Sequence, residues 1–172
     1  MLASTRPWKD IQTRIQELLR QRIQNRPAGT LDILQERQAG MAMFIAAAWP
    51  RLQEHGVSWI GFYQADHLLP DTTCMLLAAR EPKPACSPIG LHGACGQSFK
   101  SAKPMVVRDV AQLGADYIAC DPRDKSELVV PCFDKAGNAW GVIDLDSFDI
   151  GSFDERDARN VEKLLQVCQL SA

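Results

Sequence analysis

The sequence predicts an α+β protein, with a mainly antiparallel sheet that carries helices on one face and leaves the other face free for a ligand pocket. Apolar residues recur every three to four positions near both ends of the chain, which indicates amphipathic helices there. Short β-rich segments separated by Gly, Pro and Asp clusters lie between them. Helices, then a run of strands, then a helix is the order typical of an α+β layer structure.

Two helices are predicted before the strands. The first spans about residues 8–25, and its apolar positions are Trp8, Ile11, Ile15 and Leu18. The segment "NRPAGT" ends it, and Thr30 is the predicted N-cap of the second. That helix runs through "LDILQERQAGMAMFIAAAW", is strained by Pro50, and stops near Gly56.

The predicted strands and the last helix follow in order. The strand segments are "VSWIGFYQ", "TCMLLAA", "PMVVRD", "ELVVPCFD" and "NAWGVIDLDS". A final helix begins at 152–154, and its apolar stripe consists of Val161, Leu164, Leu165 and Cys168. At 172 residues the chain is long enough for one domain with a sizeable core.

Composition excludes several classes of function. A formal net charge of −2 gives no electrostatic reason to expect nucleic acid or an anionic membrane as partner. No apolar run approaches the ~20 residues of a membrane span. The N-terminal segment is Arg-rich and amphipathic, so an organelle presequence is one interpretation of it. Asp10 and Glu17 favour the other interpretation, a helix of the folded protein. Without a secretory h-region, we expect a cytoplasmic, reducing location and free thiols.

Strand alternation gathers polar and aromatic side chains on the free face of the sheet. Trp59 and Tyr63 share one face of their strand, and Asp144 and Asp146 share one face of theirs. The apolar residues of the opposite face, which we expect beneath the helices, are Ile60, Phe62, Ile143 and Leu145. Aromatic rings and carboxylates together suit a small cation with an apolar tail. The alternative is that Asp144 and Asp146 are ordinary solvent-facing positions at a strand end.

The six cysteines divide into two groups of three. Cys74, Cys132 and Cys168 lie in apolar runs, where a packing role is favoured. Cys86 lies between prolines, Cys120 opens the polar turn "CDPRDKSELVVP", and Cys95 precedes a short helix, whose N-terminus favours a thiolate. For this second group, the residues alone leave two explanations open: a redox role, or a loop position that has arisen by chance. The spacings contain no C-x-x-C and the histidines are scattered, so no metal site is expected.

Several motifs, in this order, resemble the GAF-domain free methionine-(R)-sulfoxide reductases: "SWIGFY", "KPAC", "GACG", "IACD…SELVVP" and "GVIDLDS". The likeness covers roughly residues 30–165. It implies that residues 30–172 form the GAF domain, preceded by an N-terminal helix and linker over 1–29. It also implies an activity, the thiol-dependent reduction of free L-methionine-(R)-sulfoxide, with a thioredoxin-like dithiol as the external reductant and no bound cofactor. A homodimer is one oligomeric state compatible with the resemblance.

The resemblance also assigns roles to residues. Cys120 would attack the sulfoxide sulfur, and Cys86 and Cys95 would resolve the sulfenic acid as a disulfide. The residues that would bind substrate are Trp59, Tyr63, Glu127, Asp144 and Asp146. Attack on sulfur needs a thiolate and the oxygen needs a proton, so clustered carboxyls with raised pKa values suit this chemistry. A nearby thiol protects the sulfenic acid from further oxidation.

One segment departs from the family pattern. Where the family usually reads "IPFGRGVCG", this chain has "SPIGLHGACG", one residue shorter between Cys86 and Cys95 and with His92 at the usual basic position. We expect Cys86, on a loop, to reach Cys120 before Cys95, which is fixed at a helix start. The competing interpretations are a non-catalytic GAF sensor domain that binds a small molecule and a thiol peroxide sensor.

Overall fold

The computed structural model describes residues 6–25, 32–114 and 120–172. In these ranges the helices are α1 (Trp8–Gln24), α2 (Ile33–Leu52), α3 (Ala94–Ser101) and α4 (Glu155–Val167). The strands are β1 (Trp59–Ala65), β2 (Met75–Glu81), β3 (Met105–Val107), β4 (Ser126–Phe133) and β5 (Ala139–Ser147). Short 3₁₀ turns, η1 (Gln53–His55) and η2 (Val110–Leu113), complete the described elements.

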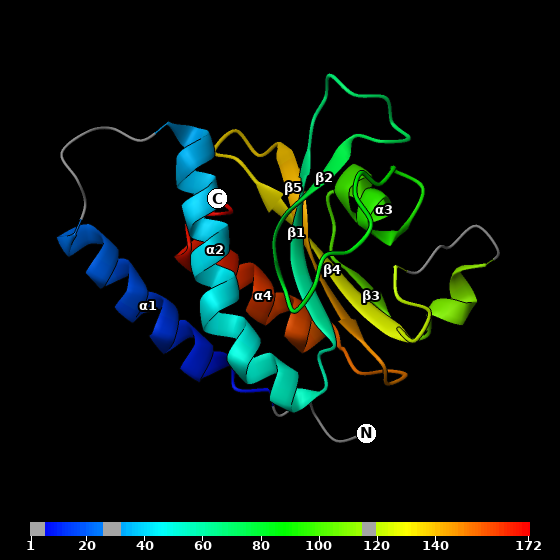
Figure 1. Ribbon diagram of the computed structural model, residues 1–172, viewed down its shortest axis with the longest axis horizontal. Helices are drawn as coiled ribbons and strands as arrows, with labels where there is room; N and C mark the ends of the chain where they lie inside the picture. The colour runs from blue at the N-terminus through cyan, green and yellow to red at the C-terminus, as the bar shows by residue number, and fades with distance from the viewer. Residues whose placement is uncertain (1–5, 26–31, 115–119) are drawn as a thin grey trace.

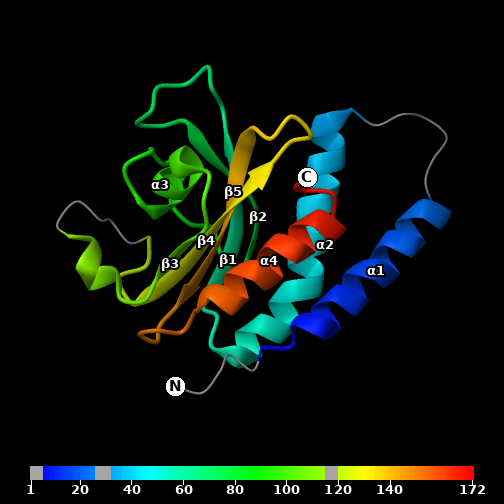
Figure 2. The same cartoon turned by 180° about the vertical axis from the view of Figure 1, so that it is seen from behind.

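The strands form one sheet in the order β2-β1-β5-β4-β3, and all neighbours are antiparallel. Helices α1, α2 and α4 lie on one side of this sheet, with α1 outermost, and α3 lies on the other (Figures 1 and 2). The predicted α+β class is therefore confirmed. The second face is not bare, however, because α3 packs against β4 and β5 there.

The main hydrophobic core fills the space between the sheet and its three-helix layer. The four strand residues predicted to lie there are all fully buried in it: Ile60, Phe62, Ile143 and Leu145. The rings of Phe44 on α2 and Phe62 on β1 meet edge to face, with centroids 5.6 Å apart. A second, smaller cluster on the opposite face includes Trp59 and Tyr63. Period-two alternation thus sorts the strand residues as the sequence predicts.

Helix α2 begins two residues later than the predicted start at 31. Its N-cap is Asp32, whose side chain accepts a hydrogen bond from the Gln35 backbone N–H at 2.8 Å. The Gln35 side chain in turn accepts from the Asp32 N–H at 3.2 Å, which completes a capping box. The predicted cap, Thr30, and the predicted boundary between residues 29 and 30 lie outside the described residues.

The end of α2 agrees with the sequence. The helix continues through Pro50 to Leu52, and η1 extends the same segment to His55. Gly56 then adopts a φ of 83°, a left-handed conformation that favours glycine and ends helices. β1 starts three residues later, which places Trp59 at the first position of a central strand.

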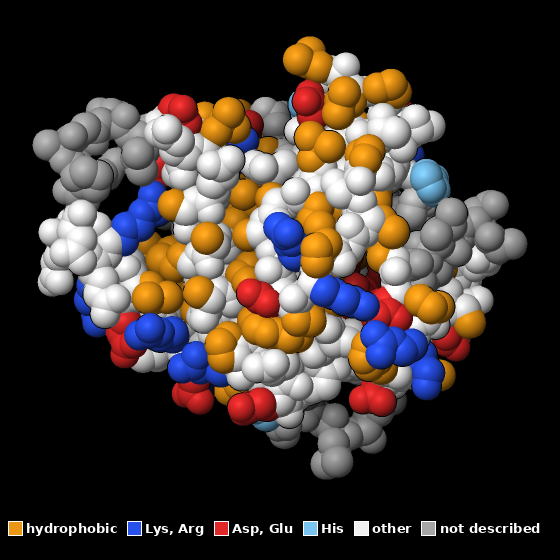
Figure 3. Space-filling model, viewed as in Figure 1, with side chains coloured by type: hydrophobic (Ala, Val, Ile, Leu, Met, Phe, Trp, Pro, Cys, Tyr) orange, Lys and Arg blue, Asp and Glu red, His pale blue; other side chains and the backbone are white. Residues whose placement is uncertain are grey.

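The described surface carries charges of both signs. On the face shown in Figure 3, Lys and Arg side chains are interspersed with Asp and Glu side chains. Among the described helices, none is long and apolar enough to cross a bilayer.

Candidate active site

A cavity of about 250 Å³ lies between the second face of the sheet, the start of α3 and the loop that joins β2 to α3. We call it the main pocket. Every residue predicted to form the site contributes to its wall: Trp59, Tyr63, Cys86, Cys95, Cys120, Glu127, Asp144 and Asp146. The fold therefore brings together residues that are up to 87 positions apart in the sequence.

Strand register explains how the acidic residues meet. On the β4–β5 ladder Glu127 lies opposite Asp146, and Asp144 lies two positions further along β5. On the β1–β5 ladder Trp59 lies opposite Asp146. Residues directly opposite in antiparallel strands point to the same face, and so do residues two apart on one strand. The three carboxyls and the indole therefore share one face of the sheet.

The two aromatic residues also hold the loop that carries Cys86. The Trp59 indole Nε1–H donates to the Lys83 carbonyl at 2.8 Å, and the Tyr63 hydroxyl donates to the Cys86 carbonyl at 2.9 Å. Both side chains are buried, with ring centroids 6.2 Å apart. Gly61 makes room for the indole, since a Cβ there would lie 2.2 Å from Trp59 Cη2. Pocket wall and cysteine loop are thus one hydrogen-bonded unit.

The carboxyls sit in an environment that disfavours their charge. Asp144 is only 9% exposed; its Oδ2 accepts from the Cys95 thiol at 3.3 Å, whereas its buried Oδ1 has no partner within the described structure. Burial raises the pKa of the Asp144 carboxyl well above its usual range, and Glu127 raises it further. Burial likewise raises the pKa of Asp146, with Asp144 as the next cause. The carboxyls of the site therefore favour their protonated form, and a bound cation would stabilise their charged form.

Cys86 and Cys120 meet at the mouth of the main pocket. Both residues are exposed, and Cys86 is close enough to the Cys120 thiol to change its pKa. Partial burial of the sulfur, followed by the Cys86 thiol, raises the pKa of Cys120 to about 12. In the ligand-free protein Cys120 is therefore a protonated thiol at neutral pH.

Cys95 corrects a prediction made from the sequence. It lies one residue inside the N-terminus of α3, after the N-cap Gly93, as expected. It is buried rather than in a loop, however, and donates its thiol hydrogen to Asp144. Burial raises the pKa of Cys95 well above its usual value, and Asp144 raises it further. A helix dipole contributes only about 0.3–1 kcal/mol, so the predicted low-pKa thiolate at this position is wrong.

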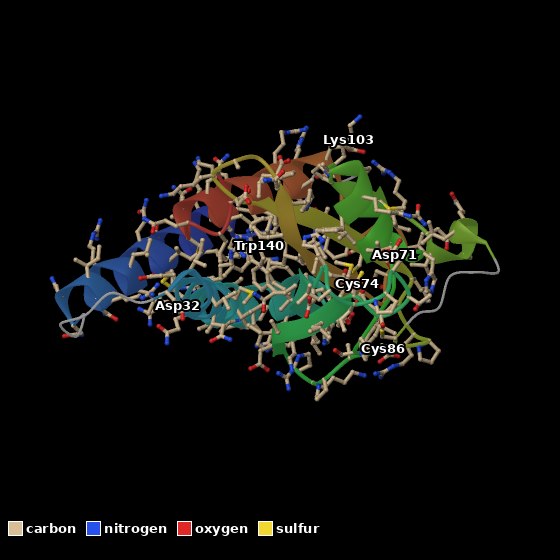
Figure 4. All side chains as sticks on the ribbon, turned by 90° about the horizontal axis from the view of Figure 1, so that it is seen from above. Asp32, Asp71, Cys74, Cys86, Lys103 and Trp140 are labelled. Atoms are coloured by element: carbon tan, nitrogen blue, oxygen red, sulfur yellow. The ribbon has the colours of Figure 1, made fainter. Side chains whose placement is uncertain are left out.

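The other three cysteines pack in the interior as predicted. Cys132 and Cys168 belong to the main core, and Cys74 belongs to the smaller cluster behind the main pocket. Burial raises the pKa of all three thiols. Figure 4 shows the contrast, with Cys74 well inside the molecule and Cys86 on a loop at its edge.

Sequence reasoning missed Asp124, a fourth acidic residue in the wall of the main pocket. It is 6% exposed, and its Oδ1 accepts from the Ser58 hydroxyl at 3.0 Å. Burial raises its pKa, partly offset by that hydrogen bond. The available signal was its place in the turn between Cys120 and β4, where a charged residue reads as an ordinary loop position.

The described side chains of the site include thiols, carboxyls and aromatic rings, with one histidine. Among the described residues no group of three or more His, Cys, Asp and Glu side chains has an arrangement that could hold an ion. His92 is the only basic residue among the described side chains of the main pocket. What the arrangement offers is thiols, carboxyls that hold protons, and aromatic walls.

Comparison with known proteins identifies the family. Residues 38–171 match the family model of the GAF domain. Free methionine-R-sulfoxide reductase of Escherichia coli is 33% identical over 129 residues, which cover 74% of this chain and 72% of that enzyme. The chain belongs to the family of GAF-domain free methionine-R-sulfoxide reductases. The enzyme family predicted from the sequence motifs is confirmed.

Other relatives of this reductase-family chain match over a smaller share of their length. The free methionine-R-sulfoxide reductase of Saccharomyces cerevisiae is 34% identical over 116 residues, 67% of this chain and 63% of that enzyme. GAF domain-containing protein A of Dictyostelium discoideum is 38% identical over 110 residues, 63% of this chain and 66% of that protein. The matched part of the chain thus spans slightly less than two thirds of these two relatives.

Solved structures agree with the family assignment. A free methionine-R-sulfoxide reductase of Neisseria meningitidis, in complex with its substrate, superposes with a TM-score of 0.74 and 28% identity, covering 94% of this chain and 86% of that one. A putative GAF sensor protein of Burkholderia vietnamiensis superposes with a TM-score of 0.72 and 30% identity, covering 95% of each chain.

Proposed function

We propose that this protein reduces free L-methionine-(R)-sulfoxide to methionine, with Cys120 as the nucleophile. The observation that carries the proposal is the pairing of two exposed thiols, Cys120 and Cys86, at a pocket where a buried carboxyl oxygen of Asp144 has no partner in the described structure. The relatives named as free methionine-R-sulfoxide reductases support the same substrate.

The substrate's ammonium group binds the acidic cluster of Glu127, Asp144 and Asp146. Burial, and after it repulsion between the carboxyls, keeps the pKa values of Asp144 and Asp146 raised; a bound cation offsets the repulsion and gives Asp144 Oδ1 a hydrogen-bond donor. The methyl sulfoxide end lies against Trp59 and Tyr63, whose rings form the apolar part of the wall. A peptide-bound methionine lacks the ammonium and cannot make this contact.

Binding also activates the nucleophile. The charge of Asp144 contributes to the raised pKa of Cys120, so an ammonium beside that carboxylate lowers the pKa and favours the thiolate. A protonated carboxyl of the cluster donates a hydrogen bond to the sulfoxide oxygen, which makes the sulfur more electrophilic. The Cys120 sulfur attacks the sulfoxide sulfur and forms an S–S bond, while the carboxyl proton passes to the sulfoxide oxygen. The hydroxyl then moves to the Cys120 sulfur as the S–O and S–S bonds to the methionine sulfur break, giving methionine and Cys120 sulfenic acid.

Cys86 then resolves the sulfenic acid. Its thiol attacks the Cys120 sulfur, a disulfide forms, and the oxygen leaves as water. An external dithiol of the thioredoxin type reduces the disulfide and becomes oxidised itself, so no bound cofactor is needed. A reducing compartment such as the cytoplasm maintains this cycle. Cys95 is the second resolving candidate, but it must leave its hydrogen bond to Asp144 before it can react.

Separate R and S epimers of free methionine sulfoxide, assayed with excess dithiothreitol, test the proposal. We expect the R epimer to be consumed, the S epimer to be left, and Cys120→Ser to abolish turnover while keeping the wild-type circular dichroism spectrum. A folded wild-type protein that consumes neither epimer overturns the enzyme assignment. Calorimetric binding of the R epimer without turnover would then favour a sensor domain.

A further inference from the structure

A second, smaller cavity of about 50 Å³ adjoins the main pocket, and Cys120 lines both. We call it the side pocket. Its other walls include Ser58, Lys83, Asp121 and Phe148. Cys86 contributes to the main pocket but not, within the described residues, to the side pocket. The Cys120 sulfur is therefore approachable from a direction that Cys86 does not occupy.

The direction of approach matters once Cys86 and Cys120 are joined. A thiolate breaks a disulfide by attack on one sulfur while the other sulfur leaves, and the exchange is faster when the leaving thiol has the lower pKa. Attack on Cys86 would expel Cys120, and burial, the largest cause of the raised pKa of Cys120, makes it the poorer leaving group. Attack on Cys120 from the side pocket expels Cys86 instead, which does not line that pocket within the described residues.

We propose that the side pocket is the port through which the thiolate of the external reductant reaches Cys120 in the Cys86–Cys120 disulfide. This inference rests on the proposed function for the identity of that disulfide. The reductant sulfur bonds to Cys120, the Cys86–Cys120 bond breaks, and Cys86 takes the electron pair and leaves as thiolate. A second thiol, from the same dithiol or another molecule, then attacks the reductant sulfur; it releases Cys120 and leaves an oxidised reductant disulfide.

The size of the side pocket suits this role. Its volume is about 50 Å³, against about 250 Å³ for the main pocket, so it is matched to a smaller group than the substrate, such as the CH₂–S⁻ end of a thiolate. Trp59 forms part of the wall of both pockets, and its indole is fixed by the hydrogen bond to Lys83. A fixed wall keeps substrate and reductant on separate paths to one sulfur.

Charged residues near the side pocket fix the two cysteine-containing loops relative to each other. The Lys83 ammonium lies 2.6 Å from Asp121 Oδ2, which joins the loop of Cys86 to the turn of Cys120. Arg123 pairs with the same carboxylate at 2.7 Å and stacks over the Phe148 ring at 4.6 Å. Lys83 is the one cation among the described residues that line the side pocket, and its ion pair fixes the position of the Cys120 turn.

The attacked sulfur can be identified directly in the wild-type protein. Diamide forms the Cys86–Cys120 disulfide without any sulfoxide, so the experiment does not depend on turnover. Excess glutathione is added, the mixture is quenched with N-ethylmaleimide, and the peptides are mapped by mass spectrometry. We expect glutathione on Cys120 and maleimide on Cys86. Glutathione on Cys86 and maleimide on Cys120 would overturn the port.

A filling variant tests the cavity itself. Phe148→Trp places a larger ring in the wall of the side pocket, where it can still lie beneath Arg123, and Leu68→Trp introduces the same side chain at an exposed site. We expect Phe148→Trp to slow reduction of the diamide-formed disulfide at least about tenfold, while the single-turnover burst of methionine, measured without reductant, stays unchanged. Leu68→Trp should change neither step.

Two reductants separate the sources of the thiol. If the variant slows disulfide reduction by both glutathione and thioredoxin, both reductants use the port. If it slows reduction by only one of them, that reductant is the one that uses the port. Equal reduction rates in Phe148→Trp and wild type for both reductants would overturn the port. A wild-type protein with no methionine burst but normal disulfide reduction would reject the proposed function and leave the port standing.

Discussion

Asp144→Asn should make the protein more stable at neutral pH and should abolish its activity. The carboxyl is 9% exposed, burial and Glu127 raise its pKa, and one of its oxygens has no partner in the described structure. An asparagine keeps an oxygen that can accept from the Cys95 thiol and removes the charge. The same charge is what the proposed mechanism uses to bind the substrate's ammonium.

The magnitude follows from removal of the charge, because asparagine also leaves one buried polar atom without a partner. An unsatisfied buried polar group costs about 1–3 kcal/mol, and a charged one costs more; we take the difference to be of the same order. For a chain of this size each kcal/mol corresponds to about 2–4 °C in Tm, so Asp144→Asn should raise the free energy of unfolding by about 1–3 kcal/mol and Tm by about 2–12 °C. Loss of repulsion with Asp146 adds to the gain in the same direction.

The gain should depend on pH. Because the folded-state pKa of Asp144 is raised, its protonated form stabilises the fold below the unfolded-state pKa, about 3.9, and that contribution is lost as pH rises through the folded-state pKa. The difference between Asp144→Asn and wild type should therefore shrink as pH falls toward about 4 and grow at neutral and higher pH.

Urea unfolding of both proteins at several pH values measures this difference, and the epimer assay measures activity. Asp71→Asn serves as the matched control because Asp71 is exposed and its side chain makes no described hydrogen bond. It should change neither quantity. Equal or lower stability of Asp144→Asn at pH 7, a gain that does not vary with pH, or retained turnover would refute the reasoning.

Three further outcomes follow from the site. N-acetylmethionine sulfoxide should show a kcat/KM about 10- to 150-fold below that of the free amino acid, because about 1.5–3 kcal/mol of charged hydrogen bonding is lost; equal values would reject the ammonium contact. Alkylation after one turnover and peptide mapping should find a Cys86–Cys120 disulfide first, and a dominant Cys95–Cys120 bond would reverse the resolving roles. Iodoacetamide labelling of Cys120 should rise about tenfold per pH unit above pH 7, without a plateau below pH 9, since burial holds its pKa near 12.

The sequence was sufficient for the fold and for the grouping of the sheet residues. Strand alternation has a fixed period, so the facing of Trp59, Tyr63 and Asp144 follows from the segments alone. The register, which the structure supplies, then places Trp59 and Asp144 near Glu127, a residue that only the family resemblance had assigned to the site. Local capping was harder to predict, because the cap at Asp32 depends on reciprocal hydrogen bonds with Gln35 that form only when the helix starts at Ile33.

Properties that depend on tertiary packing were not accessible from the sequence. The chemistry of Cys95 is decided by how α3 packs on β4 and β5, which buries the thiol against Asp144 and outweighs the helix dipole. Asp124 and the side pocket depend on how the Cys120 turn folds over Ser58 and Phe148. No periodic pattern encodes a turn of this kind.

The proposed transfer of oxygen to Cys120 can be tested most directly in the Cys86→Ser, Cys95→Ser double variant, which removes both resolving thiols. The protein is mixed with the free R epimer and with dimedone, which traps a sulfenic acid as a stable adduct. We predict methionine in a one-to-one ratio with protein and a single adduct on the Cys120 peptide. Methionine formed without an adduct on Cys120, or an adduct on another cysteine instead, would contradict the assignment of Cys120 as the nucleophile.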